Sequence, residues 1–245
     1  MRSFDRSDGN DILDFETLGD VDSVIHLAGV LGTAELFNDP HEAIDVNIHG
    51  TLNVLQWCEK NSASFVNITM PPVFPSVYTT TKICADRFAS LWNMWRGVPT
   101  AHVRAFNAYG PGQKYGVHHP QKIIPTFATL AWEGKPLQIW GSGEQTVDLI
   151  DTEDLAHMLV DATRWGDDVT FDAGTGVAFT VNRVAEMVNE ITGNIAGVEY
   201  LPMRDGEIET HIVAAGVGWD RLDWYPEFRE DKLVETVMWY KSSDE

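Results

Sequence analysis

Residues 23–29 read Ser23-Val-Ile-His-Leu-Ala-Gly29, a short apolar run that ends in two small residues. A run of this length, bounded by turn-forming residues, predicts a buried strand. Asp39-Pro40 then begins an amphipathic pattern that continues to Cys58. Both residues favour a helix start, because Asp caps free backbone N–H groups and Pro fits the first turn. A buried strand followed by a helix is the repeating unit of a parallel sheet, so this stretch predicts an α/β fold.

The same alternation of strand and helix patterns runs through the rest of the chain. Further strands are expected over Met1–Phe4, Ser64–Thr69, Ala101–Phe106, Pro136–Trp140 and Val169–Asp172. Helices are expected from Tyr78 to about Trp95 and over Lys122–Glu133, Thr152–Trp165, Val181–Thr192 and Glu230–Tyr240. No repeat, low-complexity stretch or linker separates these segments, so we expect interwoven lobes rather than domains in series.

The composition is that of a globular protein with a strongly acidic charge balance. The 245 residues contain 17 basic and 37 acidic side chains, a formal net charge of −20. This charge argues against binding to nucleic acid and to anionic membrane surfaces, and a phosphate-bearing ligand would need a local Arg, Lys or helix N-terminus. No apolar run reaches the length of a membrane span, and we expect no signal segment at the N-terminus.

Cys58 and Cys84 are the two cysteines, and they give neither a disulfide framework nor a metal-ligand spacing. Each lies within an apolar helical pattern, which favours buried free thiols in a reducing cytoplasm over a disulfide. We therefore expect no metal site and a cytoplasmic location.

Tyr78 and Lys82 stand four residues apart at the start of an expected helix. Positions i and i+4 share a helix face, so the phenol and the ammonium can point into one pocket. A nearby cation favours the ionised form of a phenol. The pair is therefore a candidate proton-transfer unit. The alternative is a solvated Lys beside a half-buried Tyr.

Further motifs follow in a recognisable order. They are His26-Leu-Ala-Gly29, Asn47, Tyr78 with Lys82, Arg104-Ala-Phe-Asn-Ala-Tyr-Gly-Pro-Gly112, Trp140-Gly-Ser-Gly-Glu-Gln145, Asp148-Leu-Ile-Asp-Thr-Glu-Asp154, Pro202-Met-Arg-Asp-Gly-Glu207 and Trp239-Tyr240. In this order the chain resembles the NAD-dependent epimerase/dehydratase family, the extended short-chain dehydrogenases that act on nucleotide sugars.

The resemblance implies a fold and a division into two parts. The fold is a Rossmann-like, doubly wound parallel sheet, N-terminally truncated, with a smaller C-terminal α/β substrate lobe. Residues 1–106 and about 145–178 would form the dinucleotide-binding part, and about 107–144 and 179–245 the substrate lobe. It also implies a homodimer, in which Pro40–Cys58 and Thr79–Trp95 pair as a four-helix bundle. Trp57, Trp92, Met94 and Trp95 would line that seam or, alternatively, belong to the core.

The resemblance also assigns roles at the substrate end of the site. Tyr78 corresponds to the acid/base, and Lys82 to the lysine that lowers the pKa of the tyrosine and binds the nicotinamide ribose. Asn107 corresponds to the asparagine that holds the sugar or its diphosphate. Arg204 corresponds to the arginine that pairs with the substrate diphosphate; its alternative is a surface salt bridge with Asp205 or Glu207.

A further set of residues matches the family's binding site for NAD or NADP. Leu27, Ala28 and Gly29 at the strand end would line the cofactor, and the small side chains of Ala28-Gly29 would let it lie close to the backbone. Asp5 corresponds to the acidic residue that binds the adenosine ribose, and Asp11-Ile12 to the pair beside the adenine. Asn47 is either a support of the site or an amide that packs between helices.

Three departures from the family pattern bear on activity. No G-x-x-G-x-x-G turn precedes Asp5, so we expect a truncated chain or a start assigned too late; alternatively, Met1–Asp5 occupies the central place in the sheet. The segment before Tyr78 is short and places Met70 where relatives carry a catalytic Ser or Thr, with Thr69 one residue early. Pro71-Pro72 replaces the Asp-Glu pair of the dehydratases, and Val147 replaces an arginine that precedes Asp148.

These matches and departures leave three functions open. The first is an NAD(P)-dependent nucleotide-sugar epimerase, or a related oxidoreductase, that oxidises a sugar hydroxyl transiently. The second is a catalytically impaired or inactive relative that serves as a binding or structural subunit. The third is a keto-sugar reductase, which keeps Tyr78 and Lys82 but stops after reduction. In each case the expected ligand is a nucleotide-diphosphate sugar.

Overall fold

Parallel strands form the central sheet of the computed structural model, which describes residues 1–32, 34–71, 73–114 and 122–242. The sheet has the order β1-β2-β3-β7, and every neighbouring pair is parallel. The strands are β1 (Ser23–His26), β2 (Ser64–Thr69), β3 (Thr100–Ala105) and β7 (Asp167–Ala173). The α/β fold with a parallel sheet that the sequence predicts is therefore confirmed.

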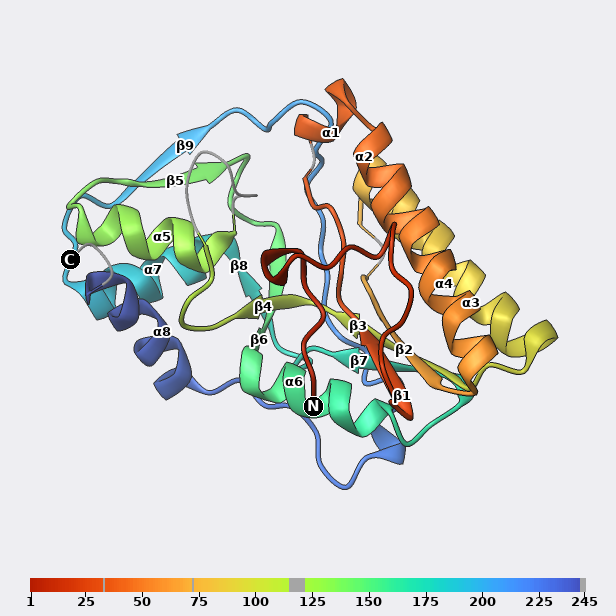
Figure 1. Cartoon of the computed structure of the whole chain (residues 1–245). Helices are drawn as coiled ribbons and strands as arrows, with labels where there is room; N and C mark the ends of the chain where they lie inside the picture. The colour runs from red at the N-terminus through yellow and green to blue at the C-terminus, as the bar shows by residue number, and fades with distance from the viewer. Residues whose placement is uncertain (33, 72, 115–121, 243–245) are drawn as a thin grey trace.

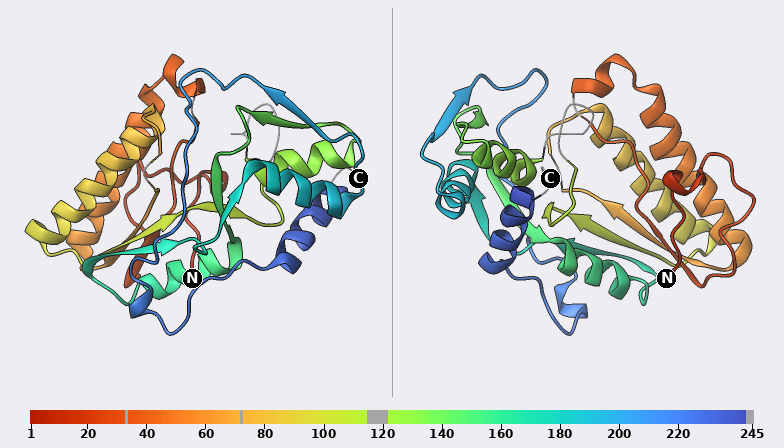
Figure 2. Two further views of the ribbon diagram at one scale, coloured as in Figure 1. Left: turned by 180° about the vertical axis from the view of Figure 1, so that it is seen from behind. Right: turned by 60° about the vertical axis from the view of Figure 1, so that its left-hand side comes forward.

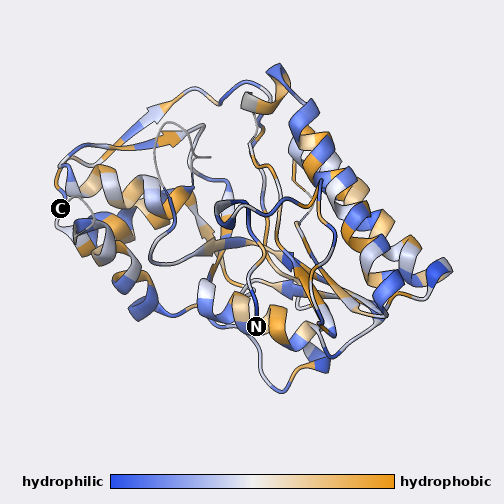
Figure 3. Ribbon diagram, in the orientation of Figure 1, coloured by the Kyte–Doolittle hydropathy of each residue, from blue (hydrophilic) through white to orange (hydrophobic). Residues whose placement is uncertain are grey.

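Helices cover both faces of this sheet (Figures 1 and 2). On one face lie α4 (Val77–Arg96) and α3 (Thr51–Asn61), which continues α2 (His41–Ile44) and the π-helical segment η2 (Asp45–Gly50). On the other face lies α6 (Thr152–Ala162), which contacts β3 and β7. Figure 3 shows apolar stretches along the strands and mixed polarity along α3 and α4, as expected for helices with one buried side.

A second lobe lies beyond the carboxyl ends of the strands (Figure 1). Its helices are α5 (Ile123–Trp132), α7 (Val181–Thr192) and α8 (Glu230–Ser242), which pack around a core that includes Tyr109, Ile124 and Leu233. Its strands are short: β5 (Leu137–Trp140) pairs with β9 (Val198–Leu201), and β6 (Thr146–Asp151) pairs with β4 (Asn107–Tyr109) and β8 (Ala178–Thr180). Short helices elsewhere in the described residues include α1 (Ala34–Asn38) and the 3-10 turn η3 (Trp219–Arg221).

The helix that carries Tyr78 begins and ends at strong sequence signals. Ser76 and Thr79 form a capping box, in which each side chain bonds the backbone N–H of the other. Gly97 ends the helix in the left-handed conformation, at a φ of 70°. This firm start fixes the first turn, where Tyr78 lies.

One predicted strand is absent. Met1–Phe4 forms no strand, and the 3-10 turn η1 (Arg6–Asp8) follows it. The side chain of Asp5 caps that turn by accepting the N–H of Ser7, while Phe4 packs edge-on against Phe15. Residues 5–10 favour turns, and no neighbouring strand pairs with the apolar residues before them. Met1–Phe4 therefore does not form a strand.

The four apolar residues proposed for a dimer seam do not behave alike. Trp57 is 8% exposed and belongs to the core between the sheet and α3, so the core alternative holds for it. Trp92 packs against the same core. Met94 and Trp95 are 68% and 75% exposed on α4. No helix in the described part of the chain combines the length and apolarity that crossing a membrane requires.

Candidate active site

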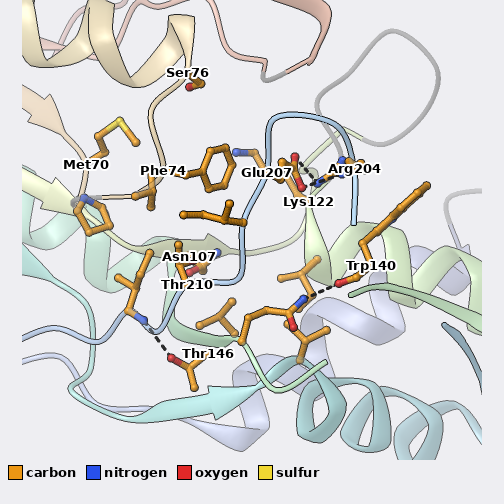
Figure 4. A pocket seen from close by; sticks show the side chains of 18 of the residues that line it. Met70, Phe74, Ser76, Asn107, Lys122, Trp140, Thr146, Arg204, Glu207 and Thr210 are labelled. Carbon is orange, nitrogen blue, oxygen red and sulfur yellow. Dashed lines mark hydrogen bonds and ion pairs between the residues drawn. The ribbon is translucent and has the colours of Figure 1, made fainter. Parts of the chain in front are cut away.

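Two adjoining cavities lie between the carboxyl ends of the central strands and the second lobe. The outer cavity measures about 450 Å³ and the inner one about 270 Å³. They share Met70, Tyr78, Asn107 and Lys122 as wall residues. Figure 4 shows the outer cavity, with side chains converging from β5, β6, the segment before α4 and the loop that carries Arg204 and Glu207. A ligand in the outer cavity can thus reach directly into the inner one.

Tyr78 and Lys82 meet at the inner cavity, as the helix spacing predicts. Tyr78 is half-buried and lines both cavities, whereas Lys82 is 4% exposed and lines the inner one. Burial lowers the pKa of Lys82 to about 8, although the charge of Asp86 opposes that shift. Among the residues that the structure describes, none forms a hydrogen bond or an ion pair with this ammonium. Its protons are available to a ligand in the inner cavity.

The protonation of Tyr78 differs from the expected one. Burial raises the pKa of the Tyr78 phenol above its ordinary value. The resemblance implies that Lys82 lowers it, whereas in the protein alone the direction of the shift is set by desolvation of the phenol. Tyr78 is thus protonated at neutral pH in the protein alone, which suits a proton donor.

Thr69 and Met70 follow one another at the end of β2, and both line the inner cavity. Thr69 also contributes, as the smallest of several causes, to the lowered pKa of Asp86 on α4. Asn67, two residues earlier on the same strand face, donates to the same carboxylate at 3.0 Å. Met70 also lines the outer cavity, together with Pro71, whereas Pro72 lies outside the described residues.

The loop after β1 provides one wall of the inner cavity. Leu27 and Gly29 line it, whereas Ala28 packs against the core on the α3 side. Asn47 is 1% exposed; its amide bonds both backbone groups of Val30 and the hydroxyl of Thr81. Asn47 therefore ties the loop after β1 to α4, as the packing interpretation expects. A Cβ at Gly29 would lie 3.2 Å from the Asn47 amide oxygen, so glycine suits this close approach.

The residues expected at the adenosine end lie outside these two cavities, and their role stays a prediction. Neither cavity has Asp5, Asp11 or Ile12 among its wall residues. The Asp5 carboxylate accepts the N–H and the hydroxyl of Ser7, and that of Asp11 accepts the N–H of Leu13. Ile12 is buried in the core beside Gly50.

Cations line the outer cavity despite the acidic charge balance. Arg204 lies 5.5 Å from the ring centre of Trp140, and its guanidinium makes two contacts with Glu207, at 2.8 and 2.9 Å. The alternative pair with Glu207 thus forms, but inside the cavity wall. Lys122, the N-cap residue of α5, lines both cavities, and desolvation lowers its pKa. Sequence reasoning missed Lys122, although a Lys at a helix start is a signal for anion binding.

The donors present fit one end of a dinucleotide. A buried ammonium without a described partner, facing Leu27 and Gly29, suits the hydroxyls of a ribose. Asn107 adds an amide where the two cavities join. Residues 1–22 form loops and one 3-10 turn, so that segment offers no helix N-terminus to a pyrophosphate. Among the described residues, no group of three or more His, Cys, Asp or Glu side chains has the arrangement of a metal site.

Comparisons with known proteins agree with this geometry. A model described as the NAD dependent epimerase/dehydratase family matches residues 2–172. The dTDP-glucose 4,6-dehydratase of Salmonella typhimurium is 28% identical over 267 residues, covering 89% of this chain and 72% of the relative. The UDP-glucuronate 4-epimerase of Thermodesulfobacterium geofontis is 27% identical, covering 94% of this chain and 76% of the relative. The structure of UDP-glucose 4-epimerase from Thermotoga maritima with UDP-glucose is 26% identical, with a TM-score of 0.82 over 91% of this chain and 78% of that one.

Proposed function

The chain belongs to the NAD-dependent epimerase/dehydratase family, and from that premise we propose that it is a nucleotide-sugar epimerase or a related NAD(P)-dependent oxidoreductase. One observation carries the proposal. Tyr78 lines both cavities, and beside it Lys82 presents an ammonium that no described residue bonds. A phenol where the two cavities join can serve a sugar in the outer cavity and a cofactor in the inner one.

The residues support a transient oxidation of a sugar hydroxyl. With its ligands bound, Tyr78 would first release its proton to solvent, which the charge of Lys82 favours. The phenolate would then accept the hydroxyl proton while the C–H bond of the same carbon breaks, and the phenol would return that proton after the hydride comes back. NAD(P), when bound, supplies the hydride acceptor. Homologous structures hold NAD or NADPH. Lys82 would bind the ribose of the nicotinamide and stabilise the phenolate by its charge.

A nucleotide-diphosphate sugar is the ligand that the outer cavity fits best. Arg204 and Lys122 supply local positive charge in a protein whose net charge is −20. A guanidinium matches the oxygens of a diphosphate, and Trp140 beside it offers a flat apolar wall. Asn107 would hold the sugar or the diphosphate. Met70 and Pro71 carry no acid or base after β2, so these residues do not support elimination of water.

The second candidate is a binding relative without turnover. One observation favours it: Met70 lines both cavities where relatives are expected to carry a Ser or Thr, and its thioether donates no hydrogen bond to a reacting oxygen. A keto-sugar reductase remains the third candidate, because reduction needs only the Tyr78 and Lys82 pair and NAD(P)H. We also propose the cytoplasm as location and a homodimer through α3 and α4, where Met94 and Trp95 are exposed.

Turnover assays separate these candidates. The protein would be incubated with NAD+ or NADP+ and, in turn, UDP-glucose, UDP-glucuronate and dTDP-glucose, with products resolved by NMR. Tyr78→Phe should cut turnover by roughly 100-fold or more, because it removes the acid/base and leaves the ring. Tyr225→Phe is the matched control, since Tyr225 is exposed and lines neither cavity. Equal turnover in wild type and Tyr78→Phe would refute the assignment. Sugar binding without any turnover would favour the second candidate, and NAD(P)H consumption with a 4-keto sugar the third.

A further inference from the structure

A polar array lies on the α4 side of the central sheet, directly behind Lys82. It consists of Asp86 on α4, His102 on β3 and Asp168 at the amino end of β7. The ring of His102 is 3% exposed, and its Nδ1 lies 2.7 Å from Asp86 while its Nε2 lies 2.9 Å from Asp168. None of the three lines either cavity. The array thus runs from the neighbourhood of Lys82 to the opposite edge of the sheet.

The two contacts of His102 determine its charge. A neutral imidazole carries one N–H, yet both ring nitrogens face carboxylate oxygens here. Two hydrogen bonds need two ring protons, so His102 is an imidazolium. Burial on its own lowers the pKa of His102, but the hydrogen bonds and charges of Asp86 and Asp168 outweigh it, and the pKa is raised. Two carboxylates that clamp an imidazolium form a stable arrangement in a buried place.

Asp86 is the junction between this clamp and Lys82. Its carboxylate accepts hydrogen bonds from His102 at 2.7 Å and Asn67 at 3.0 Å, and both favour its charged form. Lys82 lies one turn earlier on α4, and the charge of Asp86 acts against the desolvation of the ammonium. Lys82, Asp86, His102 and Asp168 carry two positive and two negative charges, which cancel.

We propose that Asp86, held by His102 and Asn67, is a positioning residue that keeps Lys82 charged in the inner cavity. Asp168 has a supporting part, since it holds the second proton of the His102 ring. The inference rests on the proposed function in one respect, namely that Lys82 serves Tyr78.

Asp86 is the anion that acts on Lys82, because the other titratable groups nearby are neutral, cationic or paired. His26 on β1 is buried. Burial, with a smaller effect from the charge of Lys82, lowers its pKa to about 3, so its ring is neutral at pH 7. Tyr78 is protonated at neutral pH. Arg104, on the same face of β3 as His102, is paired with Asp172 on β7. Lys122 lines the same inner cavity, and desolvation lowers its own pKa.

NMR titration of the whole chain tests this proposal without any turnover. Lysine labelled with 13C at Cε reports the midpoint of Lys82, assigned by comparison with Lys82→Arg, and 15N-labelled histidine reports the protonation of His102. In the wild type we expect Lys82 to titrate near its pKa of about 8 and His102 to be an imidazolium at pH 7. Asp86→Asn should lower the Lys82 midpoint by ~1 pH unit or more, as loss of a close opposite charge does.

Asp168→Asn and Asp20→Asn complete the set. Asp168 has a φ of 62°, which asparagine tolerates, so this variant keeps the backbone and removes one carboxylate. It should lower the midpoints of both His102 and Lys82, the latter by less than Asp86→Asn does. Asp20 is exposed and has no described partner, so Asp20→Asn should shift neither.

The outcomes are decisive even where a variant does not fold. A Lys82 midpoint that moves no more in Asp86→Asn than in Asp20→Asn overturns the proposal, as does a neutral His102 at pH 7. If Asp86→Asn unfolds, Asp168→Asn decides: lower midpoints of both groups support the array, and an unchanged Lys82 midpoint refutes it. Absence of turnover in the wild type would count against the proposed function but would leave these titrations readable.

Discussion

Arg204 illustrates how one side chain can serve both the protein and a ligand. Its guanidinium pairs with Glu207 and lies near the ring of Trp140, yet it lines the outer cavity. A diphosphate would compete with one carboxylate for the same N–H groups and would bring more charge to them. The pair with Glu207 therefore holds Arg204 in place for a ligand rather than removing it from use.

Arg204→Ala tests this account. We expect the affinity for the nucleotide sugar to fall roughly 10- to 100-fold, because hydrogen bonds to charged groups contribute about 1.5–3 kcal/mol. NAD(P) affinity should stay unchanged, because Arg204 does not line the inner cavity. Calorimetric titration with each ligand measures both. Arg183→Ala is the control, since Arg183 forms an exposed pair with Glu186 on α7. Equal losses for sugar and cofactor would mean that Arg204 acts through the fold alone.

The residues of the site differ in how far the sequence predicts them. The meeting of Tyr78 and Lys82 follows from helix periodicity, since four residues make about one turn. The polar array does not, because Asp86, His102 and Asp168 come from a helix and two strands. Only the register of β2, β3 and β7 under α4 brings both carboxylates within 3 Å of the His102 ring nitrogens. Local pattern carries no information about that register.

At the scale of elements, helix α4 depends on its N-terminal cap. Ser76→Ala removes the oxygen that accepts the Thr79 N–H at 3.1 Å, and we expect the free energy of unfolding to fall by ~1 kcal/mol. Urea unfolding followed by circular dichroism measures this loss. Ser90→Ala, in the middle of the same helix, should be neutral or slightly stabilising because alanine favours helices. Equal effects of the two substitutions would show that the cap contributes nothing to stability.

The elements that the sequence predicts best are those with local signals at both ends. The expected helix Val181–Thr192 is found with those bounds, because Thr180 caps its start and Gly193 ends it. The strands β4 and β8 contain three residues each and were missed. They exist through their pairing with β6, which is a tertiary contact. Met1–Phe4 shows the converse: an apolar segment without a partner strand does not become one.

At the scale of the whole molecule, two buried carboxylates fasten the chain as it returns from the second lobe. The segment after β9 runs back past the central sheet toward η3 (Figure 1). Asp148 on β6 accepts the N–H of Ala214, and Asp172 on β7 accepts those of Ala215 and Val217. The sequence marks Asp148 as part of a family motif, but its partners come from distant segments and emerge only in the folded chain.

Asp148→Ala should therefore destabilise the molecule as a unit. Asp148 is fully buried and accepts four hydrogen bonds, from the Thr175 N–H and hydroxyl, the Gly176 N–H and the Ala214 N–H. Removing the carboxylate leaves these donors buried without an acceptor, at a cost of roughly 3 kcal/mol or more in the free energy of unfolding. That loss is a large share of the ~5–15 kcal/mol that stabilises a typical domain.

Urea unfolding measures the loss, and hydrogen exchange locates it. The amide of Ala214 should exchange faster in Asp148→Ala, because its acceptor is gone and the return segment is no longer held to β6. The control is Asp220→Ala, which removes an exposed carboxylate of the same return segment that has no described partner. We expect that control to change stability by less than ~0.5 kcal/mol. Similar stability and exchange in the two variants would show that the return segment is held by its apolar contacts instead, through Ala214 and Trp219.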